Sequence, residues 1–342
     1  MKENSIISES DKVLVTGSNG FIGAKVVECL LQKGISNIRC FVRPSSRLER
    51  LESIVKRFPK AAVEFVRGDL LARDDCKTAA AGVSVIFHLA AGFEKSFAGA
   101  FMNSALATRN LLDAFLEYGS VRRFVNVSSF AVYSNLKMKR GALLDETCAL
   151  EDRPQERYDA YGFGKLKQEE IVREYGQKRS LPYVILRPGA VYGPGKPDLS
   201  GRVGINTFGF FIHLGGGNEL PLTYVDNCAE AIVLAGMTPD VEGEIFNVVD
   251  DERMSSRKFL TAYKNAKRSF SISVPYPVAY AFCSMWENYS KRTRGQLPPV
   301  FNRRRCAAEW KGNRYSNEKI HRLLGWEPKV KLAEAMDSFL SQ

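Results

Sequence analysis

Short apolar runs alternate with amphipathic segments along the first third of the chain. The apolar runs occupy residues 13–15 (VLV), 37–42 (NIRCFV), 62–67 (AVEFVR), 83–89 (VSVIFHL) and 121–127 (VRRFVNV). Runs of this length, bounded by turn residues, predict buried strands, and the helical periodicity at residues 21–31 and 97–118 predicts helices between them. Strands that alternate with helices are typical of βαβ units, so we expect a parallel sheet with helices on both faces.

The first strand leads into a glycine-rich turn, VLVTGSNGFIG at residues 13–23. Gly17, Gly20 and Gly23 follow one another at intervals of three residues. Gly17 allows a sharp exit from the strand, Gly20 lets a phosphate approach the backbone, and Gly23 lets the next helix pack closely. Because the first turn of that helix has free N–H groups, the stretch predicts an anion site, with a simple tight turn as the alternative.

Residues suited to ligand binding follow the predicted strands, and they are Gly17, Arg43, Asp69, Ala90 and Ser129. The carboxyl ends of parallel strands meet at one edge of the sheet, where α/β proteins bind ligands. We therefore expect these residues to converge on one ligand site.

Arg43 stands where a dinucleotide-binding fold places the residue that contacts the adenosine ribose, roughly 20 residues beyond the glycines. An acidic residue there would accept hydrogen bonds from a free 2′-hydroxyl, whereas a guanidinium with Ser45, Ser46 and Arg47 nearby suits a 2′-phosphate. NADP(H) is therefore favoured over NAD(H), the alternative being that the arginines only form a solvated helix start. Asp69 either accepts a hydrogen bond from the adenine amino group or caps the next helix, and the two roles are compatible.

Tyr161 and Lys165 lie four residues apart in a helical pattern that continues to Tyr175, which places both on one helix face. A lysine ammonium beside a tyrosine stabilises the phenolate and lowers the pKa of the phenol from its ordinary value of ~10. With a dinucleotide site upstream the pair predicts acid/base chemistry, whereas alone it would indicate only an amphipathic helix.

His88, inside an apolar strand, is interpreted as a core histidine. Residues 134–159, charged and interrupted by proline, predict a loop or lid near the active site that takes no part in the core.

The composition narrows the class of protein. A chain of 342 residues is long enough for one large α/β domain or for a main domain with a smaller lobe. No apolar run approaches the ~20 residues that span a bilayer, and the start MKENSIISESDK is not a signal peptide, so we expect no transmembrane segment and a cytoplasmic location. Seven cysteines without a CxxC or Cys/His cluster predict neither a disulfide framework nor a metal site. The net charge of +11 favours anionic ligands, and without a nucleic-acid-binding motif no nucleic-acid partner is expected.

An ordered set of motifs carries a family resemblance. They are TGSNGFIG (16–23), GDL (68–70), HLAA (88–91), VSSFAVY (127–133), YGFGK (161–165), LRPGAVYGPG (186–195), TYVDNCAEA (223–231), FNVVDDE (246–252) and LLGWEP (323–328). Together they resemble the extended short-chain dehydrogenase/reductase superfamily, which includes nucleotide-sugar epimerases, dehydratases and 3β-hydroxysteroid-dehydrogenase-like enzymes. The resemblance implies an α/β fold, a Rossmann-type doubly wound parallel sheet with a smaller C-terminal substrate lobe. Residues 11–190 and 226–250 would form the NAD(P)-binding domain, and residues 191–225 and 251–342 the lobe.

The resemblance also implies roles for single residues. Tyr161 would be the general acid/base, Lys165 would tune it and bind the nicotinamide ribose, and Ser129, not Ser128, would hold the substrate oxygen. The implied cofactor-binding residues are Gly17, Gly20, Phe21, Ile22, Gly23, Arg43, Asp69, Leu70, Leu89, Ala90, Ala91, Tyr161, Lys165, Pro188 and Val191. No metal ligand is implied.

The chain departs from the family pattern at three places. Ser104 replaces an asparagine of the family, although Asn103 is adjacent. Residues 220–222, Leu-Pro-Leu, stand where many nucleotide-sugar enzymes carry Arg-Asp-Phe to bind a diphosphate, while the arginines at 303–305 offer another anion clamp. Residues 274–289, VPYPVAYAFCSMWENY, resemble a hydrophobic segment of steroid-dehydrogenase-like members; this segment would line an apolar pocket, touch a membrane surface or form a core helix.

These features lead to one hypothesis and two alternatives. The leading hypothesis is an NAD(P)-dependent oxidoreductase or epimerase/dehydratase that acts on a secondary alcohol or ketone of a nucleotide sugar. The alternatives are a 3β-hydroxysteroid-dehydrogenase-like activity on an apolar ring alcohol and a non-catalytic NADP-binding regulator, against which the retained Ser129, Tyr161 and Lys165 argue. Because an epimerase needs a recycled NAD, NADP favours net oxidation or reduction. The expected partners are a small-molecule substrate and a second copy in a homodimer, with contact to a membrane surface as a further option.

Overall fold

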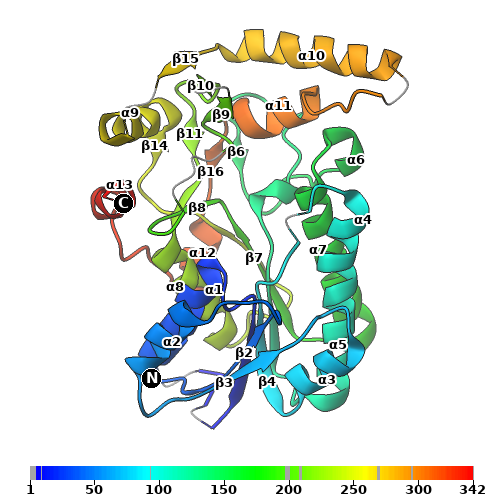
Figure 1. Cartoon of the computed structure of the whole chain (residues 1–342), viewed down its shortest axis with the longest axis vertical. Helices are drawn as coiled ribbons and strands as arrows, with labels where there is room; N and C mark the ends of the chain where they lie inside the picture. The colour runs from blue at the N-terminus through cyan, green and yellow to red at the C-terminus, as the bar shows by residue number, and fades with distance from the viewer. Residues whose placement is uncertain are drawn as a thin grey trace.

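The computed structural model describes residues 5–8, 10–92, 94–196, 201–207, 210–267, 270–293 and 296–341. Its centre is a seven-stranded parallel sheet with the strand order β13-β7-β5-β4-β1-β2-β3 (Figure 1). The strands are β1 (Lys12–Thr16), β2 (Asn37–Val42), β3 (Ala62–Arg67), β4 (Val83–His88), β5 (Arg123–Val127), β7 (Tyr183–Pro188) and β13 (Ile245–Val248). The strand order reverses between β1 and β4, which confirms the expected doubly wound α/β fold and places a ligand crevice there.

Helices cover both faces of this sheet (Figure 1). One face carries α1 (Phe21–Gln32), α2 (Glu49–Lys56) and α8 (Val225–Met237), and the other carries α3 (Arg73–Ala80), α5 (Ala107–Tyr118) and α7 (Ala160–Arg179). Alternation along β1 shows how the two cores form, because Val13 and Val15 belong to one buried cluster and Leu14 to the other. A short α4 (Phe97–Ala100) and a π-helical segment, η1 (Phe101–Leu106), lead into α5.

A second group of elements, short strands and three helices, lies beyond the carboxyl edge of the sheet. It contains β8 (Ala190–Tyr192), β9 (Gly204–Thr207), β10 (Phe210–His213), β11 (Glu219–Leu220), β12 (Leu222–Tyr224), β14 (Met254–Ser255), α9 (Ser256–Lys267), β15 (Ser271–Ser273), α10 (Tyr276–Arg292) and α11 (Arg303–Trp310). The chain ends with β16 (Arg314–Tyr315), α12 (Glu318–Leu324) and α13 (Leu332–Leu340). Residues of α12 and α13 join the same buried cluster as Val13 of the main sheet. The division into two domains at residues 190, 226 and 250 stays a prediction.

Residues 134–159 differ from the expected loop or lid. They contain β6 (Leu143–Leu144), which pairs with β16, and α6 (Pro154–Arg157). Leu144 is buried in a cluster with Phe130 and Tyr315, so the expectation that this segment takes no part in the core is wrong. The reason is a long-range contact, because Leu143 and Leu144 pair with Arg314 and Tyr315, which lie 171 residues later in the chain. In the described part of the chain, no helix combines the length and apolar character needed to cross a membrane.

Candidate active site

The glycine turn after β1 is built for close approach. Gly17 has φ +67°, a left-handed conformation that favours glycine, and a Cβ there would lie 2.9 Å from the backbone nitrogen of Ala90. A Cβ at Gly23 would lie 2.1 Å from the carbonyl oxygen of Gly17, so any larger residue would push α1 off the turn. Gly20 caps α1 without a side chain, which leaves the N–H groups of the first helical turn for a ligand.

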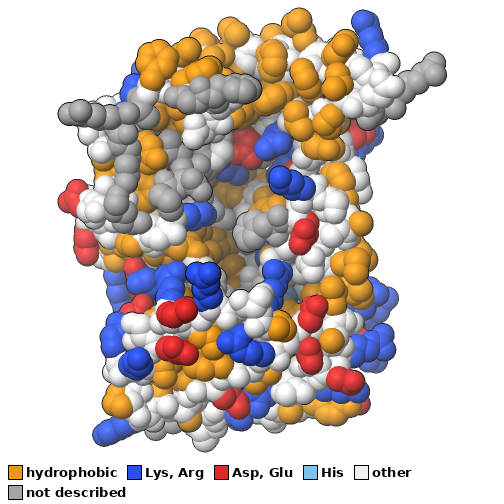
Figure 2. Space-filling model, viewed as in Figure 1, with side chains coloured by type: hydrophobic (Ala, Val, Ile, Leu, Met, Phe, Trp, Pro, Cys, Tyr) orange, Lys and Arg blue, Asp and Glu red, His pale blue; other side chains and the backbone are white. Residues whose placement is uncertain are grey.

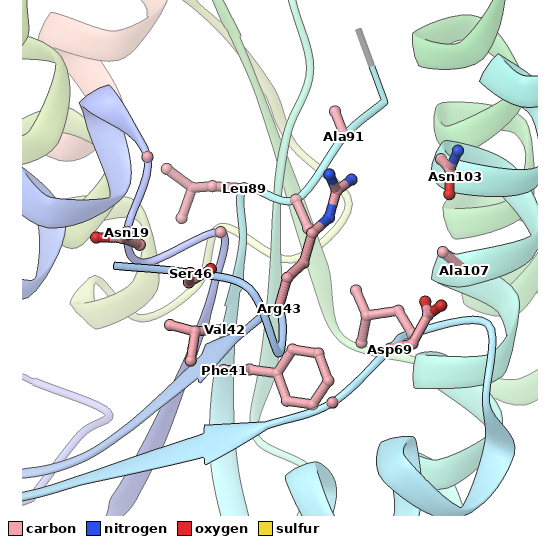
Figure 3. Close-up of a pocket in the computed structure, with 15 residues that line it drawn as sticks. Asn19, Phe41, Val42, Arg43, Ser46, Asp69, Leu89, Ala91, Asn103 and Ala107 are labelled. Carbon is pink, nitrogen blue, oxygen red and sulfur yellow. The ribbon is translucent and has the colours of Figure 1, made fainter. Parts of the chain in front are cut away.

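One pocket opens beside this turn at the ends of β2, β3 and β4 (Figure 3). The predicted residues that line it are Gly17, Gly20, Arg43, Asp69, Leu70, Leu89, Ala90 and Ala91. Figure 3 shows the Arg43 side chain extending through the middle of the view towards Ala91, with the carboxylate of Asp69 to its right. Among the described residues, the Arg43 guanidinium forms no ion pair or hydrogen bond. The pocket therefore presents an exposed cation to its contents.

The loop that carries Arg43 is held in place by Arg67 at the end of β3. Arg67 Nη1 donates to the carbonyl oxygens of Pro44 at 2.6 Å and of Ser46 at 3.2 Å. Ser46 lines the pocket, whereas neither Ser45 nor Arg47 does. One of the three neighbours expected beside Arg43 is thus in place.

A second pocket continues from the first and shares Gly17, Gly20, Leu89 and Ala91 with it. Its other predicted residues are Phe21, Ile22, Gly23, Ser129, Tyr161, Lys165, Pro188 and Val191. Every residue that the sequence predicted for the cofactor site therefore lines one of two joined pockets. Lys196 also lines the second pocket, with Nζ 5.6 Å from the centre of the Phe21 ring, and the sequence reasoning missed it. Its position directly after the GPG of residues 193–195 was the available signal.

Tyr161 lies in the first turn of α7, where the turn is fixed by its cap. Asp159 accepts a hydrogen bond from the backbone nitrogen of Gly162 at 2.9 Å. The Ser129 side chain forms a hydrogen bond with the Tyr161 phenol and accepts one from the backbone nitrogen of Ala131 at 3.2 Å. Burial raises the pKa of Tyr161 to about 12, opposite to the direction expected from Lys165, and the bond with Ser129 offsets only part of this effect.

Lys165 is buried one turn further along α7. Its Nζ donates to the carbonyl oxygen of Val127 at 2.6 Å and to Oε1 of Gln168 at 2.9 Å. Burial lowers the pKa of Lys165 to about 7. Ser129, Tyr161 and Lys165 thus meet at one end of the joined pockets, where a hydroxyl, a phenol and an amine border the same space.

Comparison with known proteins agrees with this geometry. Residues 13–248 match the NAD dependent epimerase/dehydratase family. The chain belongs to this family. It is 29% identical to the uncharacterized UDP-glucose epimerase YtcB of Bacillus subtilis, over 82% of this chain and 90% of that protein. It is 26% identical to a mouse (Mus musculus) decarboxylating sterol-4-alpha-carboxylate 3-dehydrogenase, over 97% of this chain and 90% of that protein.

The fold is shared with a solved structure. A crystal structure of UDP-glucuronic acid 4-epimerase from Bacillus cereus, in complex with UDP-glucuronic acid and NAD, superposes with a TM-score of 0.71 and 22% identity. The superposition covers 96% of this chain and 98% of that one. The resemblance to the extended short-chain dehydrogenase/reductases is confirmed, and the chain is an enzyme of that type.

In this member of the epimerase/dehydratase family, His88 is structural, as interpreted from its apolar strand. The ring is fully buried, with Nδ1 2.7 Å from Oγ1 of Thr16 and Nε2 2.9 Å from Oγ1 of Thr108. Burial, followed by the charge of Lys165, lowers the pKa of His88 to about 3, so the ring is neutral at physiological pH.

A buried ion pair that the sequence reasoning missed anchors α7 to the sheet. Arg187 of β7 binds Glu169 of α7 in a bidentate fashion, Nε to Oε1 at 2.9 Å and Nη2 to Oε2 at 2.7 Å. Arg187 also donates to the Tyr133 hydroxyl at 2.9 Å, and that hydroxyl donates to Oδ1 of Asn247 at 2.7 Å. These contacts fix the helix that carries Tyr161 and Lys165.

A third cavity adjoins Ser129 and Tyr161 on the side of the C-terminal elements. Its charged residues are Glu94, Lys95, Asp159, Arg202, Arg305 and Glu309. Arg202 Nη1 donates to the carbonyl oxygen of Ala308 at 3.0 Å, which orients its side chain. Tyr158, which also lines the cavity, has φ 55°, an uncommon conformation for a residue other than glycine.

Two of the three arginines expected to form an anion clamp are engaged in ion pairs within the protein. Arg303 pairs with Glu287 at 3.0 Å, and Arg304 pairs with Glu151 at 2.5 Å. Only Arg305 of the three lines the cavity beside Tyr161.

Ser104, which stands where the family has an asparagine, lies in the π-helical segment η1. Ser104 Oγ accepts a hydrogen bond from the backbone nitrogen of Gly92 at 3.2 Å. Asn103 lines the pocket of Arg43 and donates to Glu94 at 3.0 Å. Ser104 therefore fixes the segment that follows β4, while Asn103 faces the pocket.

Proposed function

We propose that the chain is an NADP(H)-dependent enzyme that oxidises or reduces a secondary alcohol or ketone of a nucleotide sugar. The observation that carries this proposal is the cavity beside Ser129 and Tyr161, where the cations Lys95, Arg202 and Arg305 stand among three carboxylates, those of Glu94, Asp159 and Glu309. Cations in such a cavity suit the diphosphate of a nucleotide sugar. The similarity to a UDP-glucose epimerase supports the same substrate class.

The residues at the joined pockets fit a nicotinamide dinucleotide. The glycine turn offers backbone N–H groups to a pyrophosphate. A Cβ at Gly17 would clash with the backbone nitrogen of Ala90, in the segment after β4, at 2.9 Å, so the turn tolerates no side chain there. Arg43 would bind the adenosine 2′-phosphate of NADP(H), and Asp69 the adenine. NAD is the alternative, since the similar UDP-glucuronic acid 4-epimerase holds NAD.

The proposed chemistry divides the work among three side chains. The Ser129 hydroxyl holds the substrate oxygen, and Tyr161 moves a proton to or from that oxygen. Lys165 supplies positive charge beside the phenol and binds the nicotinamide ribose. The nicotinamide, when bound, accepts or supplies the hydride and in its oxidised form adds positive charge. Such charge counteracts the burial that raises the pKa of Tyr161 to about 12.

A 3β-hydroxysteroid-dehydrogenase-like activity is the second candidate, and a specific observation favours it. Phe210, Ile212 and Phe282 line an apolar cavity between β10 and α10 that Trp310 also borders. Trp310 Nε1 donates to the carbonyl oxygen of Gly201, a residue of the substrate cavity, at 2.8 Å. An apolar ring substrate would pack against the apolar side chains of this cavity, which agrees with the similarity to a sterol-4-alpha-carboxylate 3-dehydrogenase. The third possibility, a non-catalytic regulator, leaves the retained Ser129, Tyr161 and Lys165 unexplained.

Mass spectrometry of molecules released from the purified, denatured protein tests the substrate class and the cofactor together. We expect NADP and a nucleotide sugar. Release of a sterol in place of a nucleotide sugar would support the second candidate. Tightly held NAD with a nucleotide sugar would instead indicate an epimerase and contradict the net redox reaction.

The exposed face of α10 supports the predicted contact with a membrane surface. Val278, Phe282, Met285 and Tyr289 follow a helical spacing and are 58%, 51%, 71% and 56% exposed. Figure 2 shows hydrophobic side chains gathered along this edge of the molecule. Two exposed cations, Lys291 and Arg292, follow the stripe at the C-terminal end of α10, and Lys291 pairs with Glu287 at 2.6 Å. Cations at this end suit anionic lipid headgroups. The homodimer and the cytoplasmic location stay predictions.

Vesicle flotation measures this contact. We expect the protein to float with vesicles that contain phosphatidylserine and to float less with phosphatidylcholine alone. Met285→Glu, which puts a charge in the stripe, is expected to lower the bound fraction at least about fivefold, because burying a carboxylate in the interface is costly. Met102→Glu makes the same substitution at an exposed methionine of η1, 46% exposed and outside α10, and serves as the control. Equal flotation of both variants and the unmodified chain would contradict the contact.

A further inference from the structure

Gln168 connects the buried lysine of the site to the interior of the sheet. It lies three residues after Lys165 on α7 and is fully buried. Its Oε1 accepts the 2.9 Å hydrogen bond from Lys165 Nζ, and its Nε2 donates to Oγ1 of Thr108 at 2.9 Å and to the carbonyl oxygen of Ala90 at 3.4 Å. Both ends of the amide are therefore engaged, one by the lysine and the other by α5 and the end of β4.

The hydrogen bonds around Thr108 leave the amide a single orientation. The Thr108 hydroxyl donates its one proton to the carbonyl oxygen of Ser104 at 2.6 Å. It must then accept from both Gln168 Nε2 and His88 Nε2, which assigns the ring proton of the neutral histidine to Nε2. His88 Nδ1 in turn accepts from the Thr16 hydroxyl at 2.7 Å. An amide turned the other way would face the Lys165 ammonium with N–H groups and lose its bond to Thr108.

We propose that Gln168 is a positioning residue for Lys165, oriented by Thr108 and His88 so that its carbonyl oxygen holds the lysine ammonium in the nicotinamide pocket. The proposal rests on the proposed function, because it assumes that Lys165 acts on the cofactor and on Tyr161. Only one other acceptor for Nζ occurs among the described residues, the carbonyl oxygen of Val127. Without Gln168, the buried ammonium would lose one of its two hydrogen-bond acceptors.

The charged and titratable groups around Lys165 set the expected direction of each change. Glu169 of α7 favours the ammonium, but the carboxylate is already bound to Arg187 of β7. His88 of β4 is neutral, and Tyr161 lies one turn away on α7. An apolar residue at 168 therefore lowers the pKa of Lys165 further, and a carboxylate at 168 raises it.

The test is the affinity for NADPH, followed by its fluorescence from pH 6 to pH 9, with NADH titrated in parallel. Because the ammonium donates hydrogen bonds to the ribose, binding is expected to weaken as pH rises through the pKa of Lys165. In Gln168→Leu the pH at which affinity falls should be lower, with affinity at pH 7.5 reduced about tenfold, the equivalent of one pKa unit. In Gln168→Glu the pH at which affinity falls should be higher. Gln177→Leu and Gln177→Glu, at an exposed position of the same helix, are the matched controls.

Shifts in opposite directions separate positioning from packing, since a merely structural glutamine would lower thermal stability without moving the pH profile either way. Thr108→Val keeps the shape of the residue and removes the hydroxyl that orients the amide, so it should shift the profile as Gln168→Leu does, by a smaller amount. It also serves as the readout if Gln168→Leu fails to fold. Profiles for Gln168 and Thr108 variants that match those of the Gln177 controls would overturn the proposal.

Lys165→Met distinguishes this proposal from the proposed function beneath it. If Lys165→Met binds both cofactors with unchanged affinity and pH dependence, the role of Lys165 itself is wrong. If Lys165→Met weakens binding and flattens the profile while both Gln168 variants behave as the controls do, only the role of Gln168 is wrong.

Discussion

Replacing Tyr161 by phenylalanine is expected to lower kcat by a factor of ~10²–10⁴, the usual contribution of a positioned general acid or base. The change removes one oxygen and keeps the ring, so the cap of α7 by Asp159 and the bonds of Lys165 stay intact. The dissociation constant of the cofactor should change by no more than a few-fold, because the glycine turn and Arg43 lie elsewhere in the joined pockets. Steady-state kinetics with the substrate identified by mass spectrometry and a fluorescence titration of the cofactor measure the two quantities.

Tyr175→Phe is the control for this result. Tyr175 lies on the same helix, and its hydroxyl donates to Oδ1 of Asp113 at 2.5 Å, on the side of α5. Its loss should leave kcat unchanged while imposing the same change of residue on α7. Near-normal turnover by Tyr161→Phe would rule out the proposed acid/base role.

The predictable part of the site followed local patterns. Strand ends can be located from apolar runs of three to seven residues. Parallel strands bring their carboxyl ends to one edge, so Gly17, Arg43, Asp69 and Ser129 line the same two joined pockets. Tyr161 and Lys165 needed only helical spacing to share a face. In each of these cases the information lies within a few neighbouring residues.

The unpredicted part depends on partners far apart in the chain. Gln168 reads as an ordinary helix residue until Thr108, 60 residues earlier, is seen beside it. Arg303 and Arg304 looked available for a ligand because the sequence does not show that Glu287 and Glu151 pair with them. The pKa of Tyr161 was expected to fall because the sequence shows the neighbouring lysine but not the burial that outweighs it.

Charge reversal at Arg43 tests the assignment of the cofactor. In Arg43→Asp, the carboxylate would repel a 2′-phosphate and accept a hydrogen bond from a free 2′-hydroxyl. Loss of a charge-assisted bond of roughly 1.5–3 kcal/mol is expected to weaken NADPH binding by about 10–100-fold, and the preference should pass to NADH. The loop should keep its shape, because Arg67 and not Arg43 holds it through the carbonyl oxygens of Pro44 and Ser46.

Arg47→Asp provides the same change of charge four residues away, at an exposed position that does not line the pocket. If long-range charge alone governed the preference, the two variants would respond alike, with losses of NADPH affinity that shrink together as salt is added. Direct contact predicts a large effect at position 43 and a small one at position 47. An unchanged ratio of NADPH to NADH affinity in Arg43→Asp would remove the argument for NADP and leave NAD as the cofactor that the joined pockets take.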